Sequence, residues 1–309
     1  MANLLPKLPL GKTWIRASEG ESGDAVYRRS DGAAFAKVSL GEGAMQLDEE
    51  RRRTEWLAPF DLGSATVLDW HASDDGACLV TRAVAGVPAS DLSASDLLKV
   101  WPSIAERVRA LHEIPVADCP FARSLSTMFD RAADVVTRNA VNPDFLDPEH
   151  QAIAPPVLLD RLRAQLPARL AQEARDLVVC HGDACLPNFM VDPETLRCTG
   201  VIDLGRLGTA DRYVDFSLLL ANARETWTDA AQPLAARQSL FEAHRISTPR
   251  RRAPRLLSAP GPADLGMKRD GGRAGHDCFP VVNTAVPFAK GFYLDGGAQF
   301  ISRTSHTVD

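Results

Sequence analysis

The segment between residues 177 and 204 constrains the fold of this 309-residue chain more than any other part. Three short apolar runs, at 177–180, 189–191 and 198–202, indicate strands, and a turn separates the last two. The first two runs are joined by a loop with the sequence HGDACLPN. This alternation of strands and loops predicts a small sheet whose polar residues collect at one end.

The loops of this segment carry carboxylates and a carboxamide. Asp183 and Asn188 lie five residues apart, and Asp203 directly follows the last strand. Phosphoryl transfer from ATP needs this set, because one carboxylate orients the acceptor hydroxyl and hard oxygen atoms hold Mg²⁺ on the phosphates. An isolated His-Gly-Asp usually marks only a turn. The spaced set favours a kinase-type site with Asp183 as the catalytic residue and Asn188 and Asp203 as metal ligands.

The N-terminal part of the chain predicts a small nucleotide-binding unit. A turn-rich loop at 19–24, which contains Ser22 and Gly23, precedes an alternating strand, and an Asp-Gly turn leads to a second strand at 33–38. Such a loop can lie over phosphates and offer its backbone N–H groups. Lys37, in the second strand, is expected to enter the cleft and to contact the α- and β-phosphates.

The rest of the chain changes from strands to helices. A helix with many charged residues is predicted at 44–57, where most of the charges form a solvated face. Strands are predicted at 65–70 and 77–81, on either side of an Asp-Asp-Gly turn. Beyond residue 90, apolar residues recur at helical spacing, which predicts helices near 97–112, 125–136 and 158–170. The chain is therefore expected to be of the α+β class.

Composition and charge limit the class of protein and its expected partners. With 45% hydrophobic residues and 309 residues in all, the chain resembles a soluble protein large enough for two lobes. No signal peptide or membrane span is predicted. Cys180, Cys185 and Cys198 lack the spacing of a metal site, so reduced thiols are expected. The net charge of −5 favours a cationic substrate over nucleic acid. We expect a cytoplasmic protein with no membrane or nucleic-acid partner.

The same motifs resemble those of the aminoglycoside phosphotransferases, a family related in fold to the protein kinases. The resemblance runs from about residue 20 to residue 227. Composition and periodicity alone do not indicate an antibiotic as the acceptor. The stretches that carry the resemblance are GESGDAVYRR, FAKV, ACLVTRAVAGVPASDLS, DLLKVWPS, NAVNPDFL, VVCHGDACLPNFMVDPETLRCTGVIDLGRLGTADRYVD and LLLANARETW.

The resemblance implies a protein-kinase-like bilobal fold. Residues 1–84 would form a nucleotide-binding lobe with an antiparallel sheet. Residues 85–249 would form a mainly helical lobe with the catalytic loop and the metal site, and 250–309 would remain as a tail. ATP and Mg²⁺ are the implied cofactors, and a small-molecule aminoglycoside or aminocyclitol antibiotic is the implied acceptor. We also expect a monomer.

Some residue roles come from the resemblance alone. A glutamate of the helix at 44–57 should pair with Lys37; Glu50 is the best match and Glu49 the alternative. Adenine should contact backbone groups in the connector between the lobes, at Thr81 and Ala83. Together with Ser22 and Gly23, these residues complete the expected nucleotide site.

Other titratable residues near the motifs are expected to support the structure. His112 ends a predicted helix, and His181 is expected to brace the catalytic loop without acting as a base. Asp211 and Asp215 stand at the start of a helix, where either could meet a cationic substrate. For Asp215, capping that helix and holding the catalytic loop is the favoured role. Arg206 is expected to order the loop that follows the metal-binding aspartate.

Residues 250–309 differ from the rest of the chain. They begin with an Arg-rich run and are rich in Pro and Gly, with little helical periodicity. Reading residues 250–268 one base out of frame, with permitted codons, gives a stretch that ends in Trp-Gly and a stop codon and resembles the family's C-terminus. We therefore hypothesise that a frameshift produced this tail, in which case it is expected to be disordered.

Three alternatives remain open at this stage. The same core motif serves kinases of other small hydroxylated amines, among them choline-, homoserine- and sugar-kinase relatives. A nucleotide-binding pseudoenzyme, impaired by its altered C-terminus, is a second possibility. The third and weakest is a DNA-binding role for the arginines at 250–255.

Overall fold

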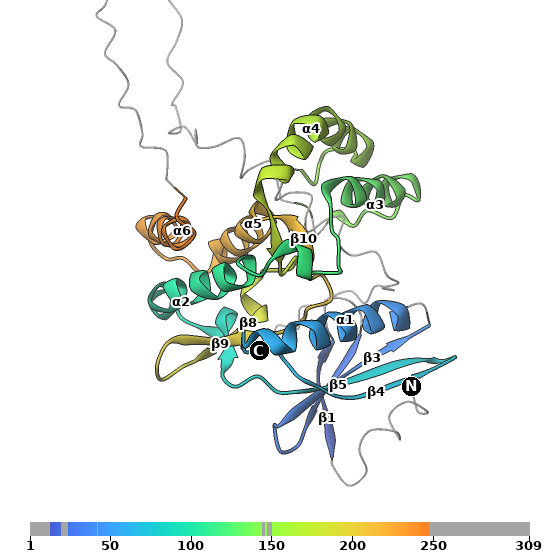
Figure 1. The fold of residues 1–309 in the computed structure, drawn as a ribbon, viewed down its shortest axis with the longest axis vertical. Coiled ribbons are helices and arrows are strands. Elements are labelled where there is room, and N and C mark those ends of the chain that lie inside the picture. The colour runs from blue at the N-terminus through green and yellow to red at the C-terminus, as the bar shows by residue number, and fades with distance from the viewer. Residues whose placement is uncertain (1–12, 20–23, 42, 144–145, 147–149, 247–309) are drawn as a thin grey trace, which may run out of the picture.

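The computed structural model describes residues 13–246, apart from 20–23, 42, 144–145 and 147–149. Figure 1 shows a smaller N-terminal lobe made of a sheet and one helix, and a larger C-terminal lobe made mainly of helices. Two sequence predictions, the phosphate loop with Ser22 and Gly23 and the basic tail at 250–309, lie outside the described residues.

The N-terminal lobe is built on a five-stranded antiparallel sheet with the strand order β1-β2-β3-β5-β4. Alternation along the central strand β3 separates its two faces. Ala36 and Val38 are buried on one face. Lys37 lies on the other, opposite Leu79 of β5, which packs against Leu47 of helix α1. The elements of this lobe are β1 (Trp14–Glu19), β2 (Ala25–Arg29), β3 (Ala34–Leu40), α1 (Gly43–Leu57), β4 (Val67–Ser73) and β5 (Gly76–Arg82).

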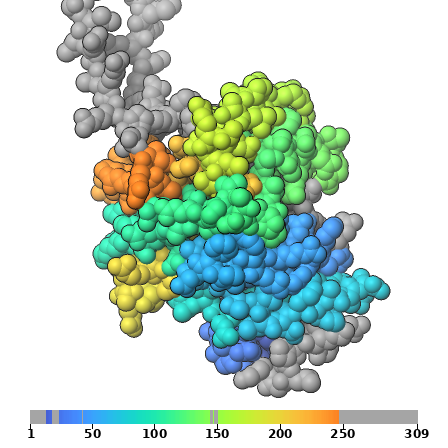
Figure 2. Space-filling model, viewed as in Figure 1, coloured from blue at the N-terminus to red at the C-terminus, as the bar shows by residue number. Residues whose placement is uncertain are grey.

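Helix α1 also joins the two lobes. In the space-filling view of Figure 2, it lies against the C-terminal lobe beside α2. Arg53 of α1 donates from Nε to the carbonyl of Leu207 at 2.9 Å. Trp56 donates from Nε1 to the carbonyl of Asp118 at 3.2 Å and meets the ring of Phe121 edge-on. These contacts tie the orientation of α1 to the loops of the C-terminal lobe.

The connector between the lobes leads into a second, three-stranded sheet with the order β6-β8-β9. Its strands are β6 (Val87–Pro88), β8 (Phe189–Asp192) and β9 (Arg197–Val201). Gly86 lies in this connector with a φ of +113°, and a Cβ there would overlap the carbonyl of Val191 in β8. Only glycine permits both this backbone conformation and this close approach. The expected domain boundary at residue 84 falls in this connector, between β5 and β6.

The C-terminal lobe has one large core. Helix α2, with Ser93 as its N-cap, buries Trp101 and Ile104 against Phe216 of α5 and Leu240 of α6. Its elements are β6 (Val87–Pro88), α2 (Ala94–His112), α3 (Leu125–Thr137), α4 (Pro155–Asp176), β7 (Leu177–Cys180), β8 (Phe189–Asp192), β9 (Arg197–Val201), β10 (Gly208–Asp211), α5 (Tyr213–Asn222) and α6 (Ala231–Ala243). Short 3-10 turns occur at Ala58–Phe60, Ala89–Asp91, Val116–Asp118, Leu186–Asn188 and Ala223–Glu225.

One detail of the predicted topology is wrong. The sequence pattern placed all three strands of the central segment in a single sheet. In the structure, β7 pairs with β10, whereas β8 and β9 pair with each other and with β6. The catalytic loop therefore bridges two small sheets. Among the described residues, no helix combines the length and apolar character that a membrane crossing requires.

Candidate active site

The site begins with a lysine surrounded by carboxylates. Lys37 Nζ lies 2.8 Å from Glu50 Oε2, 3.5 Å from Asp203 Oδ1 and 3.9 Å from Asp24 Oδ2. The sequence left two glutamates open as the partner of Lys37, and the structure pairs it with Glu50. Glu49 instead pairs with Arg53, one turn further along α1, at 3.0 Å.

The charge state of this cluster follows from burial and from the neighbouring charges. Burial alone would lower the pKa of Lys37, but Asp203, Glu50 and Asp24 outweigh it and hold the pKa above its ordinary value. Burial also raises the pKa of Glu50, against the attraction of Lys37. The charge of Lys37 is the main cause that lowers the pKa of Asp203, and Arg206 and His181 add to it. Lys37 and Asp203 therefore stay charged near neutral pH.

The three residues predicted to carry the chemistry meet at the catalytic loop. Asn188 donates from Nδ2 to the backbone carbonyl of Asp183 at 2.9 Å. The backbone N–H of Ile202, the residue before Asp203, donates to the carbonyl of Asn188 at 3.0 Å. Because the amide nitrogen of Asn188 is already used, its side-chain oxygen is the atom left for a hard cation. Asn188 is thus bonded to the backbone of Asp183 on one side and to the residue before Asp203 on the other.

Two backbone positions shape this loop. Asp203 has a φ of +57°, in the left-handed region that few non-glycine residues occupy. Gly182 has a φ of +77°, and a Cβ there would overlap the carbonyl of Arg206. The left-handed backbone of Asp203 is a strained conformation, and such conformations concentrate at functional sites because the surrounding structure must hold them. Here they bring the loop of Asp183 against the loop of Asp203.

A buried carboxylate holds the catalytic loop from behind. Asp215 accepts the backbone N–H groups of His181 at 2.8 Å and Gly182 at 2.9 Å, and His112 Nε2 at 2.9 Å. Burial would raise the pKa of Asp215, but the bond from His112, the nearby histidines and the N–H of Gly182 hold it below its ordinary value. This geometry matches the loop-holding role expected for Asp215 and the structural role expected for His112. The expected capping by Asp215 is wrong, because its oxygen atoms bond to the loop and to His112 and not to the start of α5. Asp211 instead accepts the N–H of Tyr213 at 2.9 Å.

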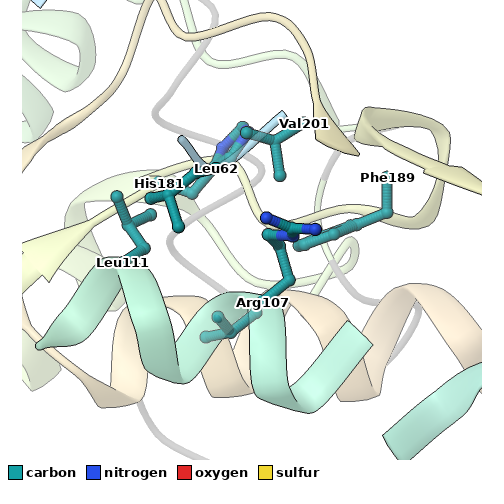
Figure 3. A pocket seen from close by; sticks show the side chains of 7 residues that line it. Leu62, Arg107, Leu111, His181, Phe189 and Val201 are labelled. Carbon is teal, nitrogen blue, oxygen red and sulfur yellow. The ribbon is translucent and has the colours of Figure 1, made fainter. Parts of the chain in front are cut away.

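His181 braces the same loop from inside. Its Nε2 lies 3.1 Å from the carbonyl of Ile202, and its Nδ1 accepts the backbone N–H of Asp183 at 3.3 Å. Figure 3 shows the side chains packed around it. The space between them is too small for a water molecule and is lined by Leu62, Arg107, Val108, Leu111, His181, Phe189 and Val201. The rear of the catalytic loop is thus dry and fixed.

Sequence reasoning did not foresee the partner of Asp183. Arg206 was expected only to order the loop after Asp203, yet its Nη1 lies 3.3 Å from Asp183 Oδ2. The side chain of Asp183 is about one quarter exposed. Arg206 therefore orients the carboxylate of Asp183 while leaving it accessible. No sequence signal could have identified this pair, because the partners come from different loops.

The backbone groups expected to contact adenine, at Thr81 and Ala83, take part in hydrogen bonds of the N-terminal sheet. Thr81 lies in β5 and is paired with both β3 and β4. The backbone N–H of Ala83 donates to the carbonyl of Ala33 at 3.1 Å. In this conformation Ala83 can offer adenine its carbonyl but not its N–H group.

The cysteines of the described part are free thiols, as expected. Burial raises the pKa of Cys78 to about 11 and that of Cys180 above its ordinary value. Cys180 also lies close to His112 and Asp215, with one possible ligand atom of each within 4.8 Å. Those atoms are occupied by the bonds to the catalytic loop and by contacts of the thiol with the carbonyls of β10. The cluster is therefore structural.

The donor set around Lys37 fits a divalent cation. Three carboxylates surround a single ammonium, so this group of side chains carries excess negative charge. Asp203 and Asn188 offer oxygen atoms from adjacent loops, and oxygen atoms are the ligands that Mg²⁺ prefers. A lysine held by a helix glutamate, beside these two oxygen donors and a loop carboxylate, is the arrangement of a phosphotransferase site of the protein-kinase type.

Comparison with known proteins identifies the family. The chain matches the model of the phosphotransferase enzyme family over residues 13–255. It belongs to the aminoglycoside phosphotransferases, as its motifs indicated. It is 50% identical over 238 residues to streptomycin 3''-kinase from Streptomyces griseus, covering 77% of this chain and 88% of that protein. It is 39% identical over 214 residues to an aminoglycoside 3'-phosphotransferase from Streptomyces fradiae, covering 66% of this chain and 78% of that protein.

A solved structure supports the same assignment. The aminoglycoside phosphotransferase APH(3'')-Id from Streptomyces rimosus, in complex with ADP and streptomycin, superposes with a TM-score of 0.71. The two chains are 46% identical, and the match covers 76% of this chain and 86% of that one. The protein-kinase-like fold of the α+β class, with an antiparallel N-terminal sheet, is therefore confirmed.

Proposed function

We propose that this protein transfers the γ-phosphoryl group of ATP to a hydroxyl of an aminocyclitol antibiotic, with the 3''-hydroxyl of streptomycin as the acceptor. Such a reaction would confer resistance to the antibiotic. The observation that carries the proposal is the convergence of Lys37, Glu50, Asp203, Asn188 and Asp183 on one site. Their identities match the inventory that phosphoryl transfer requires.

Each residue has a defined task in this proposal. Lys37, held by Glu50, binds the α- and β-phosphates. Asn188 and Asp203 would hold Mg²⁺, which neutralises phosphate charge. Asp183, oriented by Arg206, accepts the proton of the acceptor hydroxyl as its oxygen bonds to the γ-phosphorus. The bond from the γ-phosphorus to the bridging oxygen breaks, and ADP leaves. Positioning and electrostatics provide most of the acceleration.

The choice of acceptor rests on similarity and on charge. The relatives include streptomycin 3''-kinase at 50% identity and a phosphotransferase solved with ADP and streptomycin. The net charge of −5 favours the approach of a polycation. We further propose that the enzyme acts as a monomer in the cytoplasm, where its donor ATP is available.

Acceptor-dependent release of ADP tests this function directly. We expect streptomycin to stimulate ADP release by the full chain in the presence of Mg²⁺, with the phosphate on the 3''-hydroxyl by NMR of the product. Stimulation by choline, homoserine or a sugar, but not by streptomycin, would identify a different kinase. Binding of Mg·ATP without phosphorylation of any aminocyclitol would identify a pseudoenzyme.

Two substitutions separate the proposed roles of the carboxylates. Asp183→Ala should abolish turnover and leave ATP affinity near normal, because the residue acts on the acceptor. Asp203→Ala should lose the Mg²⁺-dependent part of nucleotide binding. Nucleotide titrations of the two variants, with and without Mg²⁺, decide between these roles. Equal losses of binding in both variants would contradict the assignment.

A further inference from the structure

A second cavity lies in the C-terminal lobe, on the far side of the residues that hold the catalytic loop. It is formed where the C-terminal ends of α2 and α6 meet the start of α5 and strand β7. The three helices lie side by side in Figure 1. Its accessible volume is about 150 Å³, whereas one water molecule needs only about 10–15 Å³ of such space. It is lined by Arg109, His112, Glu113, Val178, Arg212, Ala243, His244 and Arg245.

Three buried nitrogen atoms of these lining residues have no hydrogen-bond partner among the described residues: His112 Nδ1, His244 Nε2 and Arg212 Nε. His112 is only 7% exposed, and its other ring nitrogen is bound to Asp215. Arg212 Nε lies 3.4 Å from Asp176 Oδ1, an ion pair whose geometry leaves the N–H without a hydrogen bond. Buried polar atoms without partners are rare in proteins, so these three atoms require ordered water or a bound ion as their partner.

The charge of the lining indicates the sign of that species. Arg109, Arg212 and Arg245 bring three positive charges, and Glu113 is the only acidic residue of the lining. Glu113 is partly neutralised by Arg109 at 3.3 Å. Helices α2 and α6 both end here, and each contributes about half a negative charge. Asp176, outside the lining, pairs with Arg212 at 3.4 Å. Arg245 is therefore the one guanidinium of the three for which no acidic partner is found among the described residues.

We propose that this cavity binds a small tetrahedral oxyanion, with inorganic phosphate as its occupant. Such an anion supplies the acceptor oxygens that Arg212 Nε lacks, and it can bridge Arg212 and Arg245 with charge-assisted hydrogen bonds. The imidazole rings of His112 and His244, whose centroids are 5.2 Å apart, complete the wall. Neither histidine belongs to the proposed phosphotransferase chemistry, so the site is independent of the proposed function.

Proton uptake accompanies binding at His244. Its Nδ1 donates to the carbonyl of Leu240 at 2.8 Å, so in the neutral ring Nε2 is an acceptor and would repel an anion. Burial, and then the charges of His112, Arg212 and Arg109, lower the pKa of His244 to about 4. A bound anion opposes that shift, so Nε2 gains a proton and donates to it. Anion affinity should therefore rise as pH falls from neutrality toward that value.

The groups that face His244 come from three elements. Arg109, His112 and Glu113 belong to the end of α2, Arg212 precedes α5, and Arg245 follows His244 itself. Behind them lies Asp215, which accepts His112 Nε2 and the two N–H groups of the catalytic loop. An occupant of the cavity therefore contacts a residue that is one hydrogen bond away from the brace of the active site.

Histidine-detected NMR of the full chain tests the proposal. Imidazole nitrogen resonances of His112 and His244, assigned by their loss in His112→Gln and His244→Gln, are followed during titration with phosphate and, separately, with sulfate. Sodium chloride at matched ionic strength is the reference. Sulfate does not titrate near neutral pH, so any pH dependence of its affinity belongs to the protein. Arg245→Gln removes one cavity charge, and Arg138→Gln removes a matched charge at the end of α3.

We expect saturable shifts at both histidines with phosphate and sulfate but not with chloride. Arg245→Gln should weaken binding by about three- to tenfold, and Arg138→Gln should not change it. Sulfate should bind more tightly at pH 6 than at pH 8. Shifts that chloride reproduces would mean general screening, and the absence of shifts would mean that the cavity holds only water. Either result, or equal binding by the two arginine variants, overturns the proposal.

Discussion

The carboxylate of Asp215 offers the sharpest test of how the active site is held in place. It accepts three hydrogen bonds at 2.8–2.9 Å, from His112 and from the backbone N–H groups of His181 and Gly182. Asp215→Asn keeps the shape of the side chain but replaces one acceptor oxygen with an NH₂ group. That group then faces one of the three N–H donors that the carboxylate now accepts. Hydrogen bonds to a charged group contribute about 1.5–3 kcal/mol each.

The expected loss of stability is about 3–5 kcal/mol, the range found when one partner of a buried charged network is removed. For a chain of this size, that loss lowers the melting temperature by about 6–20 °C. Asp134→Asn, which breaks only a surface pair with Arg138, should change stability by less than about 0.5 kcal/mol. Urea and thermal unfolding of both variants measure the difference.

Activity and pH extend the same test. Misplacing Asp183 should reduce kcat about a hundredfold, while ADP affinity stays near normal because Lys37 and Asp203 are untouched. The pKa of Asp215 is held below its ordinary value. Its contribution to stability is therefore complete above about pH 4 and is lost as pH falls through the folded-state pKa, a loss absent from Asp215→Asn. Unchanged stability and turnover in Asp215→Asn would refute the proposal that Asp215 holds the loop of Asp183 in place. A folded Asp215→Asn variant that lost ADP binding and turnover to the same extent would also refute it.

Three further predictions follow from single positions. Glu50→Gln should weaken ADP binding about tenfold, because Lys37 loses its 2.8 Å partner, whereas Glu49→Gln should not; equal titration curves for the two variants would rule out this pairing. Gly182→Ala should cost at least about 1–3 kcal/mol in urea unfolding, since its φ is +77° and its Cβ would overlap a carbonyl; wild-type stability would contradict this. A frame-restored C-terminus should raise streptomycin-dependent ADP release above that of the full chain and of a truncation after residue 249. Equal rates in all three would show that the tail has no effect.

The secondary structure was largely predictable because it is encoded locally. A charge-rich helix was predicted at 44–57, and α1 spans Gly43–Leu57. The helix predicted near 97–112 is α2 at Ala94–His112, and Ser93 is its N-cap. Strand pairing was less predictable, since apolar runs do not specify their partners. This is why β7 was assigned to the wrong sheet.

The sequence by itself determined the chemical inventory of the site. The spacing of Asp183, Asn188 and Asp203, together with Lys37 on an alternating strand, was enough to predict a kinase-type site. The family was predicted from the resemblance of the longer stretches around these residues. Lys37 lies within β3, and the other three residues lie in the loops that adjoin β7, β8 and β9, whose apolar runs the local pattern predicts.

Only the tertiary structure decided how those residues are held. It selected Glu50 over Glu49, paired Arg206 with Asp183, and placed Asp215 under the backbone of His181. Neighbouring glutamates differ by only about 100° around a helix, so the packing of α1 chooses between them. The other contacts join residues from separate loops and helices, and no local pattern encodes which of these will meet in a folded core.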